Sequence, residues 1–565
     1  MIGENLSIRP ATQTDVEALL TWWNDGAVMA HAGFPQGLHL SANQVEATVD
    51  AFQNAIDCDG SRRAMLYILE VDGLAVGEMN YRRLKEDLTT FEIGIKICNS
   101  NYQGGGRGTC YLMMLLGELF IYQNAARVVL DTKKDNLRAQ KVYEKIGFSR
   151  VAVQQEAIEY ALSLENWLNL HPLSVTKDQI KHFLMQHHAM TKHRPYVGKS
   201  GLMAYLDKVG CIQFDPIDMC GKSPELTVHA HIDGIDKAQY YEMLYKDRVL
   251  LDYFDKNLCV LPLGNWPALH PERQRYLELS GIRSGEQTKS QEAERHVLEW
   301  IHRHGATSSK DLSLDEKVDW YWGPTRLSRA TLERLYFEGK LIIHHKNGTN
   351  KYYALAEDYI PKALRLAPSP FSDMADYHNY MVHRRIRAIG MLRNKQSDGF
   401  LGIIGFKASH RSATFKALHA SQKIIPLAVE GISEVCYIAT EDWPSLKAVL
   451  LQTPAQSDRL YFIAPLDAMI WDRKLIAQLW DFNYKWEIYT PKSERQFGYY
   501  VLPMVYQGNF IGRIELDYHK GTKKVEVLNR WLEPWFSEKI KSKSFKKQFE
   551  NALNLAIKAL EHFHG

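Results

Sequence analysis

The chain has 565 residues, of which 45% are hydrophobic and 24% charged, with a formal net charge of +3 at pH 7. Because one hydrophobic core seldom serves more than about 250–300 residues, we expect several domains. No apolar run approaches the ~20 residues that cross a bilayer, and the first residues lack a signal-peptide pattern, so no membrane partner is expected. The seven cysteines include no Cys-x-x-Cys pair, which indicates reduced thiols, no zinc site and a cytoplasmic protein.

Charge is distributed unevenly along the chain. Residues 1–170 carry 15 Lys and Arg against 21 Asp and Glu, a net charge of −6, and the rest carries 54 against 45, or +9. An acidic N-terminal part and a basic C-terminal part favour different partners, and a polyanion would bind the basic part. The alternative is an ordinary fluctuation in a long chain.

The first 150 residues alternate between strand and helix patterns. Residues 6–20 predict a strand, a turn and a helix, and residues 65–71 and 74–81 predict a hairpin that turns at Asp72-Gly73. A strand at 91–97 leads into a glycine-rich loop and an apolar helix over 111–123. A strand at 128–132 and a helix over 135–146 follow.

A glycine-rich loop between a strand and a helix presents backbone N–H groups at the positive end of the helix dipole, which suits a pyrophosphate. The loop reads QGGGRG over residues 103–108, and Gly147-Phe148 ends the later helix. Together these motifs resemble the GNAT N-acetyltransferases over about residues 5–165, and they predict a domain at 1–168. The resemblance implies acetyl-CoA as cofactor, bound by Gln103, Gly104, Gly105, Gly106, Arg107, Gly108, Thr109, Asn136 and Ala139.

The same resemblance implies that the Tyr143 hydroxyl donates a proton to the departing thiolate. Acetyl transfer requires a neutral amine, so a base must accept a proton directly or through water. Glu92, on the strand before the loop, is the first candidate and Glu78 the second. The alternative for Glu92 is a solvated strand residue. The sequence leaves open whether the amine belongs to a small molecule or a protein.

A short linker is predicted at residues 166–175, before a second and longer region. His187, His188 and His193 then lie close together in sequence. No carboxylate or cysteine stands at a ligand spacing from them, so they predict solvated histidines near a helix end and no metal site.

The segment CIQFDPID, residues 211–218, follows a helical run that ends at Gly210. In a strand, Gln213 and Asp215 would point to the same side. A carboxylate beside an amide can hold a water between them, as hydrolysis of a glycosidic bond requires. The alternative is a structural Asp215 that caps the turn before Pro216.

Further blocks at residues 245–254, 258–262, 462–473 and 498–503 accompany this segment. In this order and spacing they resemble the YcaQ/AlkZ winged-helix DNA glycosylases, over about residues 171–565. The Gln-apolar-Asp form implies action on bulky N7-alkylguanines or interstrand crosslinks. In that chemistry Asp215 would stabilise the sugar cation and accept the water proton, while Gln213 orients the water. No lysine nucleophile is implied, so the predicted enzyme is monofunctional.

Winged-helix units are predicted at residues 171–285, 290–358 and 374–445, the second with a hairpin that turns at Asn347-Gly348. An antiparallel sheet with strands that include 485–489, followed by a basic helix, is predicted at 458–565. The fold class is therefore α+β multidomain, a GNAT α/β domain before tandem winged helices and a sheet. The residues expected to contact double-stranded DNA are Arg326, Arg329, Lys346, Lys351, Arg384, Arg385, Arg387, Lys407 and Arg411.

Three functions fit these patterns. The favoured one is a DNA-repair glycosylase fused to an acetyl-CoA-dependent acetyltransferase. The second is a winged-helix transcription regulator whose first domain is a sensor or acetyltransferase. The third is an acetyltransferase that modifies DNA-bound protein, in which the C-terminal part of the chain serves only to tether the enzyme.

Overall fold

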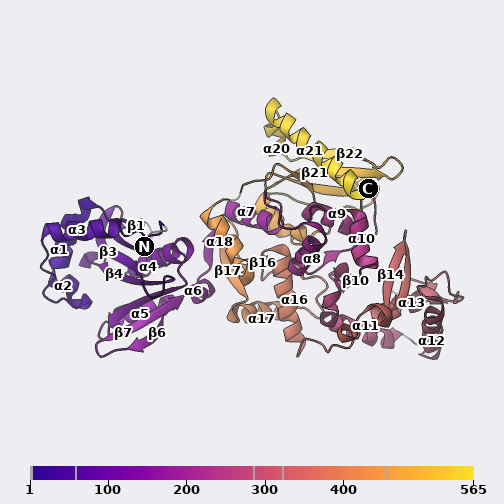
Figure 1. Ribbon diagram of the computed structural model, residues 1–565, viewed down its shortest axis with the longest axis horizontal. Helices are drawn as coiled ribbons and strands as arrows, with labels where there is room; N and C mark the ends of the chain where they lie inside the picture. The colour runs from indigo at the N-terminus through magenta and orange to yellow at the C-terminus, as the bar shows by residue number, and fades with distance from the viewer. Residues whose placement is uncertain (1–3, 58–59, 284–286, 321–322, 454) are drawn as a thin grey trace. The chain divides into compact units, whose positions relative to one another are not determined.

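A computed structural model describes residues 4–57, 60–283, 287–320, 323–453 and 455–565 (Figure 1). The chain divides into two compact units, Met1–Leu173 and Ser174–Gly565. Within the described ranges, no helix is both long enough and apolar enough to cross a membrane.

The first unit is built on a seven-stranded sheet in the order β1-β2-β3-β4-β5-β7-β6. Only β4 and β5 run parallel, and they pair only over residues 90–92 and 127–129. Both strands continue beyond this point without pairing to each other, so they diverge and leave a slot. The strands are β1 (Leu6–Pro10), β2 (Ala64–Val71), β3 (Leu74–Arg83), β4 (Thr90–Ile97), β5 (Arg127–Lys133), β6 (Ser149–Val153) and β7 (Ala157–Ser163).

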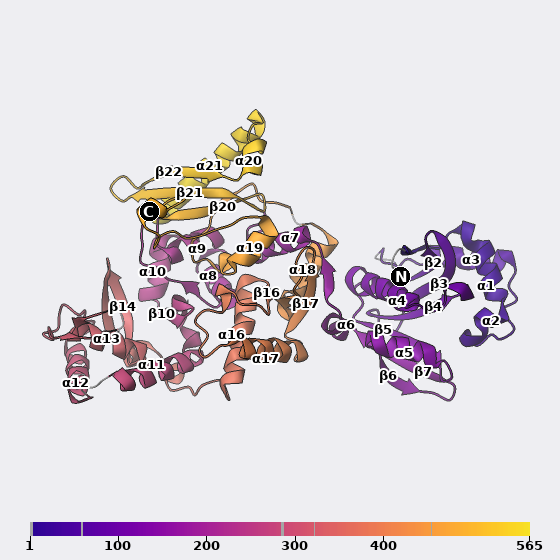
Figure 2. The ribbon, with the colours of Figure 1, turned by 180° about the vertical axis from the view of Figure 1, so that it is seen from behind.

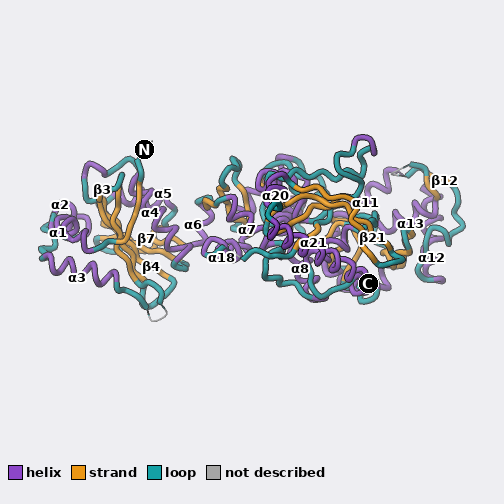
Figure 3. The backbone as a smooth tube through the Cα atoms, turned by 90° about the horizontal axis from the view of Figure 1, so that it is seen from above, coloured by secondary structure: helices purple, strands orange, loops and turns teal. Residues whose placement is uncertain are grey.

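Helices cover both faces of this sheet, as Figure 3 shows from above. On one side lie α1 (Val16–Asn24), α2 (Gly26–Met29) and α3 (Ala42–Gln53). On the other lie α4 (Arg107–Gly117), which continues into a π-helical turn, and α5 (Leu137–Ile146). The predicted hairpin is confirmed, because Asp72 and Gly73 have φ of 52° and 81°, as a tight two-residue turn requires.

The boundary between the two units, after Leu173, falls inside the linker predicted at 166–175, but the segment has regular structure. Residues 164–170 form α6 (Leu164–Leu170), capped by the Ser163 hydroxyl, and β8 (Leu173–Val175) follows. Trp167 and Leu168 are both 4% exposed, and the Trp167 ring packs 5.3 Å from that of Phe120. Burial of these apolar side chains orders a stretch whose composition resembles a linker.

Four sheets organise the second unit: β10-β11-β9, β14-β15, β16-β18-β17-β8 and β19-β20-β21-β22, besides the short pair β12-β13. The strands are β9 (Ile212–Gln213), β10 (Leu250–Asp255), β11 (Asn257–Pro262), β12 (Lys317–Val318), β13 (Thr325–Arg326), β14 (Leu341–Asn347), β15 (Asn350–Leu355), β16 (Leu392–Arg393), β17 (Ile424–Val429), β18 (Cys436–Ala439), β19 (Leu460–Phe462), β20 (Val501–Tyr506), β21 (Asn509–His519) and β22 (Lys524–Leu532).

The main helices are α7 (Lys177–His187), α8 (Gly198–Val209), α9 (Ser223–His231), α10 (Lys237–Tyr245), α11 (His270–Arg283), α12 (Gln287–His304), α13 (Leu327–Phe337), α16 (Met374–Ile389), α17 (Ala408–Ala420), α18 (Trp443–Leu451), α19 (Arg473–Trp480), α20 (Pro534–Lys539) and α21 (Lys543–His564). Figure 2 shows α21 lying along the sheet of β20, β21 and β22.

Two of the apolar cores in the described part of this unit border the segment 211–220. One is continuous from α8 through β10–β11, α13, β14–β15, α16 and α17. The other lies between α21 and the sheet of β19–β22. Cys211 and Ile212 belong to the first core and Cys220 to the second. The segment 211–220 therefore passes from one core to the other, and both cores fix its backbone.

Two local predictions in this unit have opposite outcomes. The hairpin at Asn347-Gly348 is confirmed, with Gly348 at φ 60° between β14 and β15. The strand predicted at 485–489 is wrong. The carboxylate of Glu487, 6% exposed, accepts hydrogen bonds from the backbone N–H groups of residues 496–498. These bonds stabilise a loop, and residues 485–489 do not form a strand of the sheet.

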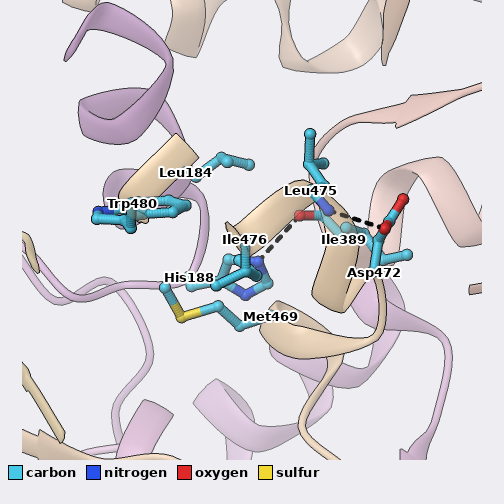
Figure 4. A pocket seen from close by; sticks show the side chains of 8 residues that line it. All are labelled: Leu184, His188, Ile389, Met469, Asp472, Leu475, Ile476 and Trp480. Atoms are coloured by element: carbon cyan, nitrogen blue, oxygen red, sulfur yellow. Dashed lines mark hydrogen bonds between the residues drawn. The ribbon is translucent and has the colours of Figure 1, made fainter. Parts of the chain in front are cut away.

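His187 and His188 are buried rather than solvated, with 2% and 1% exposure, so the prediction is wrong for these two, whereas His193 is exposed as expected. The Nε2 atoms of His187 and His188 lie 2.8 and 3.1 Å from the carbonyl oxygens of Arg387 and Ile389 on α16. Burial lowers the pKa of both imidazoles. His188 borders an apolar gap of only 10 Å³ (Figure 4). No metal-ligating cluster occurs among the described residues.

Candidate active sites

A pocket of 390 Å³ opens in the first unit where β4 and β5 diverge. Helix α2, the end of β4, the glycine-rich loop, α4 and α5 form its walls. Eight of the predicted cofactor or catalytic residues line it: Gln103, Gly104, Gly106, Gly108, Thr109, Asn136, Ala139 and Tyr143. Gln103 and Tyr143, which are 40 positions apart in the sequence, thus line the same pocket.

The loop is shaped to present backbone amides. Gly104, Gly105 and Gly106 all have positive φ, at 95°, 61° and 82°, where a side chain would cost energy. Helix α4 begins at Arg107, and the first N–H groups of a helix have no partner inside it. Arg138 also lines the pocket, an arginine that the sequence analysis did not select. Free amides, a helix N-terminus and a guanidinium together fit a diphosphate.

Two residues of the predicted cofactor set lie outside the lining. Gly105 shapes the turn, and Arg107 binds the carboxylate of Glu4 through Nε at 2.9 Å and Nη2 at 2.6 Å. The guanidinium of Arg107 also lies 5.7 Å from the ring centroid of Tyr102. Arg107 therefore fastens the loop to the N-terminal segment in this structure.

On α5, Asn136 and Tyr143 have separate structural environments. The Asn136 side chain caps the helix by accepting from the Ala139 N–H at 3.2 Å. Tyr143 is 8% exposed, and its ring lies 5.7 Å from that of Tyr160. Burial, with a smaller contribution from Asp131, raises the pKa of Tyr143 to about 12. The phenol therefore stays protonated at neutral pH, as a proton donor must.

The two base candidates lie on the strands beside the pocket but outside its lining. Glu92 is exposed on β4, three residues before Ile95 at the pocket edge. Glu78, on β3, is 2% exposed and bonds Trp23 Nε1 at 2.9 Å. Its carboxylate also pairs with Lys96 Nζ at 2.7 Å, and Lys96 does line the pocket. Glu78 is thus linked to the slot through Lys96.

In the second unit, β9 contains only Ile212 and Gln213, and it pairs with β11 so that Gln213 faces Cys259. Asp215 lies two residues beyond Gln213, in a loop. Its Oδ1 accepts from the Ile217 N–H at 2.9 Å, so it does cap the turn. Gln213 is 6% and Asp215 9% exposed. Burial raises the pKa of Asp215, against the opposing effect of the Ile217 N–H.

Lys256, in the turn between β10 and β11, contacts the side chain of Gln213. Its Nζ is 3.3 Å from Gln213 Oε1 and 5.0 Å from the ring centroid of Trp471. Burial and then the charge of Arg385 lower the pKa of Lys256 to about 8. Trp471 is held in turn by a hydrogen bond from Nε1 to the Leu466 carbonyl at 2.8 Å.

Arg384 and Arg385 do not face solvent, which corrects their prediction as DNA contacts. Both bind the buried carboxylate of Asp255, and Arg384 Nη2 also donates to the Gly210 carbonyl at 2.6 Å. Arg385 is fully buried. Burial would raise the pKa of Asp255, but the two guanidinium groups lower it to about 2. The arginines are therefore internal counter-ions beneath the segment 211–218.

Lys346, on the β14–β15 hairpin, is likewise an internal residue and not an exposed phosphate contact. Its side chain is 8% exposed and its Nζ lies 2.7 Å from Asp252 Oδ1. Tyr245 donates to the other oxygen of Asp252 at 2.9 Å. The Lys346 Nζ also lies 3.7 Å from the ring centroid of Phe214. The hairpin therefore packs directly against the residue between Gln213 and Asp215.

Matches to two known families cover most of the chain. The family described as DNA glycosylase AlkZ-like matches residues 206–563, and the GNAT acetyltransferase domain matches residues 5–149. The chain belongs to the AlkZ-like DNA glycosylase family. It carries a GNAT acetyltransferase domain in front of the AlkZ-like region, so both enzyme families are present in one α+β multidomain protein.

Several solved acetyltransferases are similar to part of this chain. A spermidine N-acetyltransferase from Vibrio cholerae, in complex with CoA and spermine, is 16% identical; the match covers 29% of this chain and 98% of that one, with a TM-score of 0.26. An aminoglycoside acetyltransferase in complex with coenzyme A is 20% identical over 28% and 95%, with a TM-score of 0.24. A putative acetyltransferase from Salmonella typhimurium with acetyl-CoA is 19% identical over 28% and 94%, with a TM-score of 0.24.

The other predicted DNA contacts of the AlkZ-like region are at least partly accessible. The side chains of Arg326 and Arg329 are each 59% exposed, although both pair with nearby carboxylates. Lys407 is exposed, and Lys351, Arg387 and Arg411 are half-buried. These six residues stay candidates for phosphate contacts.

Sequence analysis missed the residues that support the AlkZ-like motif. Lys256 stands between Asp255 and Asn257, which reads as an exposed turn, and Asn257 does have φ 60°. Asn257 is exposed, but Asp255 and Lys256 are buried, and Gly402 packs on them so closely that a Cβ there would lie 3.0 Å from Lys256 Cα. Trp471 belongs to a block that marks the family, and its contacts with Lys256 and Arg385 now give that block a structural role.

Proposed function

We propose that the AlkZ-like region hydrolyses the N-glycosidic bond of bulky N7-alkylguanines, including those in interstrand crosslinks, in double-stranded DNA. The observation that carries this proposal is the buried pair of Gln213 and Asp215 at the end of β9, with the carboxylate anchored at one oxygen. In the described part of the chain, the other oxygen of Asp215 accepts no hydrogen bond from protein. It is therefore available to a water or to the sugar.

N7-alkylation makes guanine cationic, and so a good leaving group. Asp215 then stabilises the positive charge that develops on the sugar, and it accepts a proton from the attacking water. Gln213 orients that water. The products are free alkylated base and an abasic site, and no covalent intermediate is needed.

The test of this proposal is single-turnover base release from duplex DNA that carries N7-methylguanine, and separately from a nitrogen-mustard crosslink. Release of the base with an intact abasic strand supports a monofunctional glycosylase. Sequence-specific binding to undamaged duplex without release would favour the transcription regulator instead.

We propose that the first unit transfers an acetyl group from acetyl-CoA to an amine. The loop glycines, the amides of Gly108 and Thr109, and Arg138 would hold the diphosphate, and Asn136 would contact the pantetheine arm. When bound, acetyl-CoA supplies an activated acyl group. Glu92, or Glu78 as the second candidate, would accept the proton of the amine, and Tyr143 would protonate the departing thiolate.

Replacing Tyr143 with Phe is expected to lower the turnover of acetyl transfer by about 100-fold, as loss of a general acid does. The measurement is thiol release from acetyl-CoA with a panel of diamines, aminoglycosides and peptide amines. Tyr160→Phe is the matched control, because the Tyr160 hydroxyl bonds Glu144 at 3.1 Å and lies outside the pocket lining. Equal turnover in both variants would exclude Tyr143 as the acid.

We also propose that the exposed cations of the AlkZ-like region bind phosphates in a cytoplasmic protein. Removing one of them, as in Lys407→Gln, is expected to reduce the slope of log affinity against log salt by about 1. Lesion-containing and undamaged duplexes would be affected alike, because phosphate contacts carry no sequence information. An unchanged slope would exclude Lys407 from the DNA interface.

A further inference from the structure

Lys256 is an internal cation without a carboxylate partner. It is 4% exposed, and no ion pair joins its Nζ to any carboxylate in the described ranges. Neighbouring Asp255 is bound by Arg384 and Arg385 and is not available to it. A buried ammonium is costly unless polar groups compensate it. The groups that face it are the Gln213 amide oxygen at 3.3 Å and the Trp471 ring.

This contact decides which end of the Gln213 amide faces the lysine. The oxygen and nitrogen of a glutamine amide are hard to tell apart by shape alone, so the hydrogen-bond partners must assign them. A lysine ammonium donates only and cannot accept. The amide oxygen must therefore face Lys256, and the NH₂ group must point away from it.

We propose that Lys256 is a positioning residue that fixes the Gln213 amide so that its NH₂ group, and not its oxygen, faces the site of reaction. This inference rests on the glycosylase activity proposed above. Gln213 is then a hydrogen-bond donor and Asp215 an acceptor. A water between them accepts from Gln213, donates to Asp215, and keeps a lone pair free to attack the sugar. The reversed amide would compete with Asp215 for the water protons.

The charge state of Lys256 makes the idea testable. The charged or titratable groups around it are Arg385, which lowers the pKa, and Cys259, Cys211 and Asp398, which raise it, after burial as the main cause. When the pH exceeds the Lys256 pKa of about 8, the amine is neutral. It then has a lone pair and can accept a hydrogen bond from the Gln213 NH₂ group. Both amide orientations then become possible, so deprotonation removes the constraint.

We therefore expect the single-turnover rate of base release, at saturating enzyme, to fall about 10-fold as pH rises from 7 to 9.5. Lys256→Arg keeps a donor-only cation through this range, so its rate should stay level. Lys256→Met should be about 10-fold slower than wild type at pH 7 and equally independent of pH. Persistence of the alkaline decline in Lys256→Arg would overturn the proposal.

Lys208→Met is the matched control. Lys208 is a half-buried lysine in the same unit, also with a lowered pKa, but it pairs with Asp442 at 3.5 Å, away from Gln213. Its variant should keep the alkaline decline. Covalent trapping of wild-type enzyme on DNA by borohydride, lost in Lys256→Met, would show that Lys256 attacks the sugar, and would replace positioning by nucleophilic catalysis.

A second measurement does not depend on activity. Gln213→Glu places a carboxylate beside the Lys256 ammonium, so it should raise the thermal stability of the second unit relative to the same change in a Lys256→Met background. Absence of this coupling would refute the contact itself. The stability change caused by Gln213→Glu could depend on Lys256 although the protein releases no base at any pH. This result would refute the glycosylase proposal and leave the contact between Lys256 and Gln213 in place.

Discussion

Asp215→Asn is expected to slow base release from N7-methylguanine duplex by at least about 100-fold, with DNA binding unchanged. The amide keeps the size of the side chain, and its oxygen still accepts from the Ile217 N–H, so the turn survives. It carries no negative charge to stabilise the sugar cation, and it cannot take the water proton. The measurement is the single-turnover rate at saturating enzyme, with affinity measured separately.

Asp218→Asn is the matched control for this result. Asp218 lies in the same segment, and its carboxylate pairs with Lys520 at 3.1 Å. The variant should retain the rate of wild type within about a factor of two, since surface pairs contribute little. If Asp215→Asn were as active as Asp218→Asn, Asp215 would be only the cap of its turn.

Local signals in the sequence predicted much of the first unit, because they depend on neighbouring residues. Asp72-Gly73 dictates its own turn, and the three glycines of the loop dictate left-handed backbone before α4. The helix α6 was not predicted, because the deciding contact is the packing of Trp167 on Phe120, more than 40 residues away. No local pattern contains that contact.

The same distinction explains the errors in the second unit. Arg384 and Arg385 stand in a basic helix that looks like a DNA-binding surface, and only their partner Asp255, about 130 residues earlier, makes them internal. The charge of Lys346 predicts an exposed residue of the wing, but its contacts with Asp252 and Phe214 place it inside. Single charged residues indicate exposure only where no distant counter-ion exists, and the sequence does not show distant pairs.

Asp255→Asn is expected to lower the free energy of unfolding of the second unit by about 3–5 kcal/mol, because it leaves two buried guanidinium groups without a counter-ion. The measurement is hydrogen exchange of α16 and β10 peptides during urea titration, which reports this unit separately from the first. Asp178→Asn is the control. Its carboxylate is 80% exposed and pairs with Lys181 at 3.3 Å, so the loss should stay under about 1 kcal/mol.

The pH dependence of this loss follows from the depressed pKa of Asp255, about 2 in the folded protein. A carboxylate whose pKa is lowered by folding stabilises the fold above its unfolded pKa, roughly 3.9. That contribution disappears as pH falls through the folded value. The stability difference between wild type and Asp255→Asn should therefore be full at pH 7 and become smaller between about pH 4 and pH 2. A difference independent of pH would mean that the shape of the side chain, and not its charge, holds Arg384 and Arg385 beneath Gln213.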